Sequence, residues 1–196
     1  SDLNLQHRPL NAYVTANAVH VKSANRSTTV RQTKIPYTEA FPPFLIKNRG
    51  TVILLAKDTS ILFAGRPSLY QMIAASGHRT IVPHVDLPNL EQFIHQAETH
   101  HNVLIVFPST SSTFPSNLEG VVLIDPGVDS DIPPPATPTV LLYTDNKTAD
   151  QGEGEEWSNT RTETVTYRTR DMVDSSKARE KFGQIIANFL DRIHSR

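Results

Sequence analysis

The stretch HNVLIVFPSTS, residues 101–111, decides the fold. Its four consecutive apolar residues, 103–106, predict a strand that is buried on both faces, because a short apolar run between polar residues is typical of a covered sheet. The run ends at Phe107 and Pro108, and Ser109 follows. In an α/β sheet, ligands lie just beyond the carboxyl ends of the strands, which makes Ser109 the first candidate for a site.

Comparable apolar runs occur on both sides of this stretch. The predicted strands are 51–56, 80–85, 103–106, 120–125, 139–143 and 163–168. Several of the segments between them carry apolar residues at helical spacing, and the clearest helix is predicted over 175–196. Strands that alternate with helices predict an α/β fold, with a mostly parallel sheet flanked by helices in three layers.

Two helices carry local predictions. Asp86 is expected to cap a helix with Pro88 in its first turn, since aspartate accepts hydrogen bonds from the first amides of a helix. The helix over 175–196 is expected to face the core with one apolar stripe. Its members are Ala178, Phe182, Ile185, Phe189, Leu190 and Ile193.

Residues 1–48 differ in composition from the rest of the chain. Partial alternation in 19–22 predicts one or two exposed strands, arranged as a hairpin or as an extension of a sheet edge. We therefore divide the chain into an extended N-terminal arm, 1–48, and a folded domain, 49–196. An arm with unpaired strand edges also predicts contact with a protein partner or self-association.

Composition argues against several classes of function. A net charge of -1 argues against nucleic acid as a partner, and the lack of cysteine excludes disulfides and thiolate sites. No apolar run reaches the ~20 residues of a membrane span. No glycine-rich phosphate loop follows a strand, so we expect no nucleotide cofactor. The spacing of the histidines predicts no metal site. A polar start at Ser1 suits an exported, cell-envelope protein or a trimmed chain.

From residue 50 onward, the order of elements resembles the α/β-hydrolase superfamily. Residues 50–86 are similar to its opening strand, oxyanion loop and first helix, 102–111 to its nucleophile strand and elbow, and 139–146 to the strand that presents the acid. The chain order in that family is Ser, then Asp or Glu, then His. The resemblance implies that Ser109 takes the place of the nucleophile and Asp145 that of the acid.

The sequence departs from the family pattern at two points. Phe107 and Ser111 replace the two glycines of the elbow, and Arg170, Asp171 and Met172 stand where the histidine is expected. A serine without a base is not activated, so Ser109 and Asp145 are expected to be vestigial.

Three functional interpretations follow from this pattern. The first is a non-catalytic domain, a pseudoenzyme that acts as a protein-binding or scaffold component. The second is an esterase-like serine hydrolase that uses Ser109 and Asp145. The third is an interaction domain of Rossmann or flavodoxin type. The departures from the family pattern favour the first, and no metal ion or cofactor is expected for it.

Overall fold

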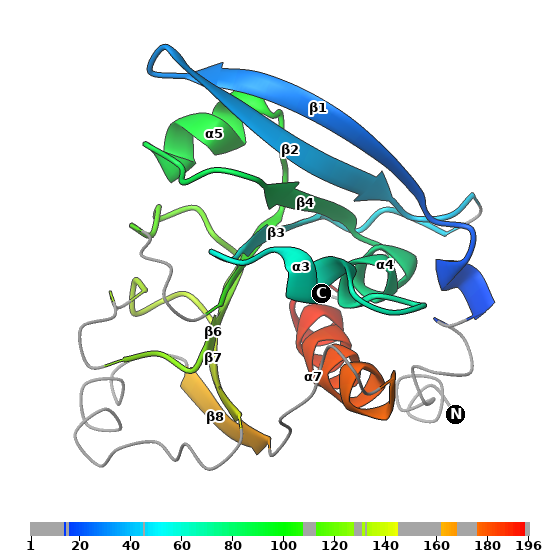
Figure 1. Ribbon diagram of the computed structural model, residues 1–196. Helices are drawn as coiled ribbons and strands as arrows, with labels where there is room; N and C mark the ends of the chain where they lie inside the picture. Colours follow the sequence, from blue (N-terminus) through cyan, green and yellow to red (C-terminus); the bar gives the residue numbers. More distant parts are fainter. Residues whose placement is uncertain are drawn as a thin grey trace.

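One sheet of eight strands organises the molecule, in the order β1-β2-β4-β3-β5-β6-β7-β8 (Figure 1). The computed structural model describes residues 14, 16–44, 46–107, 113–127, 131, 133–144, 162–167 and 176–194. The strands are β1 (Lys22–Val30), β2 (Thr33–Phe41), β3 (Thr51–Leu55), β4 (Arg79–Pro83), β5 (Asn102–Val106), β6 (Gly120–Ile124), β7 (Thr139–Thr144) and β8 (Thr162–Tyr167). Strands β3 to β8 pair in parallel, which confirms the predicted class.

The centre of the sheet is covered on both faces, as its apolar runs predict. Every residue of β3, β5 and β6 is buried. The helices are α3 (Ser60–Phe63), α4 (Leu69–Ala75), α5 (Leu90–Gln96) and α7 (Ser176–His194). Helices α4 and α7 pack with Val52 and Ile105 on one face, whereas α5 packs with Ile53 and Leu104 on the other (Figure 1). The three predicted layers are therefore confirmed.

Local sequence signals set the ends of α4 and α5, the helices that precede and follow β4 in the chain. Ser68 and Gln71 form a capping box at the start of α4, and Gly77 follows the helix at φ +105°, a conformation that favours glycine. Helix α5 begins at Leu90 because the Asn89 side chain accepts from the Gln92 amide at 2.8 Å. The expectation that Asp86 caps this helix is therefore wrong: it precedes the cap by three residues.

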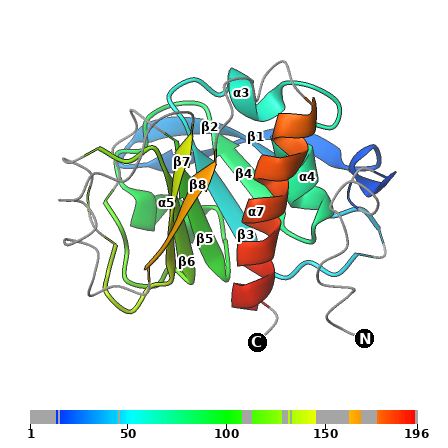
Figure 2. The same ribbon diagram turned by 90° about the horizontal axis from the view of Figure 1, so that it is seen from below.

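Helix α7 lies along one face of the sheet, as Figure 2 shows. Phe182 and Leu190 are fully buried and Phe189 nearly so, which confirms the predicted core-facing stripe. Ile185 and Ile193 are half-buried and pack against the same core cluster, and Ile186 is more deeply buried than Ile185. Among the described residues, no helix combines the length and hydrophobicity that crossing a membrane requires.

A two-stranded hairpin, β1 with β2, extends the sheet beyond β4. β2 pairs antiparallel with β4, and its buried carboxylate, Glu39, accepts from Nε and Nη2 of Arg79 at 2.9 and 2.7 Å. Arg26 of β1 binds the other oxygen of Glu39. These three residues, which we call the Glu39 clamp, join β1, β2 and β4. The division of the chain at residue 48 stays a prediction.

Candidate active site

The carboxyl ends of β3 and β5 meet at one edge of the sheet. The amide of Phe107, just after β5, donates to the carbonyl of Leu55 at the end of β3, at 2.8 Å. The chain reaches Ser109 two residues after this hydrogen bond. Ser109 itself and Asp145, which follows the end of β7, lie outside the described residues. The elements that lead to both residues therefore run to the same edge, as the parallel order predicts.

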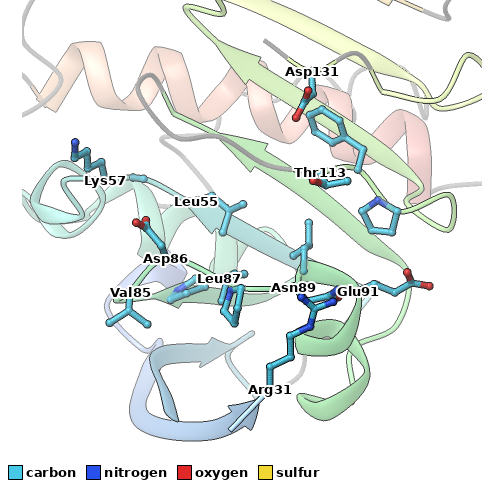
Figure 3. Close-up of a pocket in the computed structure, with 16 residues that line it drawn as sticks. Arg31, Leu55, Lys57, Val85, Asp86, Leu87, Asn89, Glu91, Thr113 and Asp131 are labelled. Carbon is cyan, nitrogen blue, oxygen red and sulfur yellow. The ribbon is translucent and has the colours of Figure 1, made fainter. Parts of the chain in front are cut away.

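A cavity of about 600 Å³ opens at this edge (Figure 3). Its apolar lining comes from the end of β3, the loop after β4, the start of α5 and the segment after β5. The larger apolar residues among them are Leu55, Val85, Leu87, Leu90 and Phe114. Ligand sites in α/β sheets lie in this position, and the volume suits a small organic molecule.

Charged side chains of both signs surround the cavity. Lys57 follows β3, Arg31 comes from the turn of the β1–β2 hairpin, and Asp86, Glu91 and Asp131 supply carboxylates. Figure 3 shows Arg31 and Asp131 on opposite sides of it. Among the described residues, neither Arg31 nor Lys57 has an ion-pair partner. Asp86, expected to be a helix cap, thus lines the cavity instead.

The position of Arg31 depends on an unusual turn. Arg31 and Gln32 have φ values of +48° and +64°, so the two central residues of the hairpin turn are both left-handed. Two-residue hairpins favour this geometry because it matches the twist of the strands, although Asn and Gly adopt it at lower energy. The turn therefore stores some backbone strain while it holds a guanidinium beside the cavity.

The loop after β3 is held by its own aspartate. The Asp58 carboxylate accepts from the Ser60 amide at 3.0 Å, and hydrogen bonds from the side chain and amide of Ser60 lower the pKa of Asp58. Asp58 therefore stays ionised and keeps α3 starting at Ser60. The loop occupies the position that the resemblance gives to the oxyanion loop.

No described histidine faces this cavity. His84 is the one that follows the carboxyl end of a described parallel strand. Thr38 on β2 donates to Asn25 Oδ1 at 3.0 Å, so its oxygen accepts from His84 Nε2, 2.5 Å away. Because β2 lies on the side of β4 that is remote from β5, this bond holds the ring away from β5. The ring instead lies 6.2 Å from that of Phe63, centroid to centroid.

Solved structures similar to this chain share its architecture. A predicted CIB-like hydrolase from Thermoplasma acidophilum aligns with 88% of this chain and 99% of its own, at a TM-score of 0.60 and 12% identity. The fold is α/β-hydrolase-like. Dienelactone hydrolase from Anabaena variabilis aligns with 89% of this chain and 99% of its own, at a TM-score of 0.57 and 12% identity.

A cold-adapted esterase from an Arctic intertidal metagenomic library is also similar in structure. It aligns with 89% of this chain and 95% of its own, at a TM-score of 0.54 and 12% identity. No protein family model and no curated protein matches the sequence. At this identity the similarity establishes the α/β-hydrolase-like fold.

The comparisons correct the first functional interpretation. The similar structures named above are hydrolases and an esterase, and nothing in the described residues supports a non-catalytic, protein-binding scaffold. The pseudoenzyme interpretation is therefore wrong. The pseudoenzyme interpretation rested on the absence of the elbow glycines and of the histidine. These residues affect the rate of catalysis more directly than they affect the class of fold.

Sequence reasoning missed a second polar cluster, at the opposite edge of the sheet. His78, His101, Glu119 and His194 come together there from four separate loops and helix ends. His78 carried no local signal, and His194 lies in the last helix, too far along the chain for the place of the family's catalytic histidine. The position of His194 at the polar border of the apolar stripe, near the end of α7, was the signal that could have indicated it.

Proposed function

We propose that this chain is a serine hydrolase that cleaves ester-like substrates in the cavity at the carboxyl edge. Ser109 is the proposed nucleophile and Asp145 the proposed acid. The observation that carries the proposal is the hydrogen bond from Phe107 to Leu55, which aligns the end of β5 with the loop after β3 beside a cavity of about 600 Å³. The α/β-hydrolase-like fold supports the same location.

The proposed reaction is acyl transfer. The Ser109 oxygen attacks the carbonyl carbon of the ester, the alcohol leaves with a proton, and water then hydrolyses the acyl-serine. Backbone amides of the loop after β3 are the proposed donors to the oxyanion, because this loop holds that role in the fold family. The apolar lining of the cavity suits a short acyl chain or a ring.

The rate is expected to be low. Seven of the eight histidines are described, and none of them faces the cavity; His7 is the eighth. Loss of the histidine from an aligned triad lowers kcat by on the order of 10⁶-fold, and the oxyanion donors and binding retain a residual acceleration. We therefore expect slow turnover that increases with hydroxide concentration.

Labelling with a fluorophosphonate probe tests the nucleophile. We expect slow stoichiometric labelling that maps to Ser109, together with weak hydrolysis of p-nitrophenyl acetate. Ser109→Ala should abolish both, whereas Ser111→Ala, two residues away, should leave both unchanged. Labelling that survives Ser109→Ala, or no labelling of the folded chain at any pH, contradicts the proposal.

The pH dependence of labelling tests the base. Without a histidine, the rate should rise steadily from about pH 7 to about pH 9. A plateau with an apparent pKa near 6.5 would instead indicate a histidine base, and His7→Gln would remove the plateau if that residue supplies it.

A further inference from the structure

The polar cluster at the amino edge of the sheet joins α7 to three other segments. His78 precedes β4, Glu119 precedes β6, His101 precedes β5, and His194 is the last residue of α7. His78 is fully buried, and the His194 side chain is only 2% exposed. Nε2 of His78 lies 3.0 Å from Nδ1 of His194, and Nε2 of His194 lies 3.1 Å from a Glu119 oxygen. The two imidazoles thus join the end of α7 to the residue just before β4.

Other charged groups surround the imidazole pair. Arg49, before β3, donates to the Ser76 carbonyl at 2.8 Å and pairs with Asp191 of α7 at 2.6 Å. The second Glu119 oxygen lies 2.6 Å from Nδ1 of the exposed His101. Arg192 of α7 lines the adjacent cavity of about 680 Å³, together with Phe189. The charged or titratable groups that act on the pair are Glu119, Arg49 and His101.

When both imidazoles are neutral, the contacts that run from Ser76 through His78 and His194 to Glu119 can form with every donor pointing toward Glu119. Nδ1 of His78 lies 3.1 Å from the Ser76 hydroxyl, which donates to it if it turns away from the Ile73 carbonyl, 2.7 Å away. His78 then donates to His194, and His194 presents its remaining N–H to Glu119, although this last contact is poorly aligned as a hydrogen bond. Each neutral ring supplies one donor and one acceptor, so the Ser76–His78 and His78–His194 contacts can both be hydrogen bonds.

One added proton also fits the same geometry. A doubly protonated His194 donates to His78 and faces the Glu119 carboxylate as an ion pair. His78 then donates to the Ser76 hydroxyl, which donates to the Ile73 carbonyl at 2.7 Å. The His78–His194 and Ser76–His78 hydrogen bonds reverse direction, and the Ser76 hydroxyl then donates to the Ile73 carbonyl instead of to His78.

A second proton does not fit. Both rings would then carry N–H groups on the nitrogens that face each other across 3.0 Å, with no acceptor between them. The His78 charge would also be buried beside the Arg49 guanidinium. Such a buried, unpaired charge is strongly unfavourable, so the contact between the two rings must break.

We propose that His78, His194 and Glu119 form an acid-sensitive latch that accepts one proton and, on receiving a second, releases the last turn of α7. Release would open the cavity beneath Phe189, because Arg192, Ile193 and His194 form part of its wall. The ring of His194 packs closely against Gly50, since a Cβ atom added to Gly50 would lie 2.9 Å from Cε1 of His194.

The pKa shifts of the pair agree with this geometry. Burial, followed by the charges of Arg49 and His194, lowers the pKa of His78 to about 3. Burial also lowers the pKa of His194, against the opposing effect of Glu119. Because both values lie below the unfolded value near 6.5, the latch stabilises the fold fully above that pH and weakens as the pH falls toward about 3.

Hydrogen exchange read by mass spectrometry tests the latch. Peptides that cover 186–194 are compared with those of β5 and β6 between about pH 7 and about pH 3, after correction for intrinsic exchange rates. In the unmodified chain, the end of α7 should lose protection at a higher pH than the sheet. In His194→Leu, which keeps an apolar side chain but cannot titrate, this early loss should disappear. His95→Gln, an exposed control, should behave as the unmodified chain.

A second variant covers the case in which His194→Leu does not fold. Glu119→Gln removes the counter-charge for the first proton, so the end of α7 should be released at a higher pH than in the unmodified chain. The proposal is overturned if α7 and the sheet lose protection together in the unmodified chain. It is also overturned if either variant follows the unmodified profile.

Discussion

Glu39 is the buried acid on which the outer part of the sheet depends. Its side chain is 2% exposed and is paired with Arg79 and Arg26. Arg79 also donates to the carbonyls of Ala97 and Glu98 at the end of α5, at 3.0 and 3.2 Å. The charge of Arg79 is therefore fixed in place and cannot turn to water when its partner is removed.

Replacing Glu39 should destabilise the fold strongly. Glu39→Gln leaves the guanidinium of Arg79, whose side chain is 14% exposed, without a counter-charge, and we expect a loss of about 3–5 kcal/mol in the free energy of unfolding. Urea denaturation measures it, with the exposed Glu98→Gln as a control expected to change stability by less than about 0.5 kcal/mol. Equal effects of the two substitutions would show that the clamp contributes little.

Tyr70 should set an alkaline limit to stability. Burial raises its pKa to about 12, although the hydrogen bond of 2.9 Å with Ser23 opposes the shift. Its ordinary value is 10.0, so the unfolded chain loses this proton first, and the stabilisation present below pH 10 is lost as the pH rises toward about 12. In an absorbance titration at alkaline pH, Tyr70→Phe should remove a component near pH 12. A difference spectrum that titrates near pH 10 would contradict this.

At the scale of elements, α7 shares the cover of one sheet face with α4. Its Phe182 is fully buried and stacks on Phe107, with ring centroids 6.3 Å apart. We expect Phe182→Ala to lower the free energy of unfolding by about 3–5 kcal/mol, because a cavity would form beneath the helix. Thermal melting tests this, with Lys177→Ala on the exposed side of α7 as the control. A change below about 1 kcal/mol would show that α7 packs loosely.

The boundaries of the inner elements were largely predictable from the sequence. The predicted run 103–106 became β5 at 102–106, and the helix predicted over 175–196 became α7 at 176–194. Both segments bury apolar side chains at a regular period, which a local pattern reveals directly. The antiparallel pairing of β2 with β4 was not predictable, because it depends on Glu39 meeting Arg79, 40 residues away.

At the scale of the whole molecule, the order of strands and helices predicted the fold better than the sequence motifs did. Alternating strands and helices predicted the sheet, and the carboxyl edge follows from its parallel order. Which side chains converge there did not follow, because Arg31 enters from the hairpin and Asp131 from the segment after β6. The absent elbow glycines then received too much weight in the functional interpretation. They describe one turn, whereas the fold rests on dozens of buried contacts.

Helix α7 has a consequence for how the chain is made. It follows all of the described strands in the sequence, yet together with α4 it covers the face formed by Val52 and Leu54 of β3 and Ile105 of β5. Ribosomes add roughly 5–20 residues per second, so about 4–14 seconds separate the synthesis of β5 from that of α7. Throughout that interval the nascent chain presents an apolar sheet surface that α4 covers only in part, because α7 is still missing. Chaperone binding on the ribosome should therefore matter more for this chain than for proteins whose covering helix is made first.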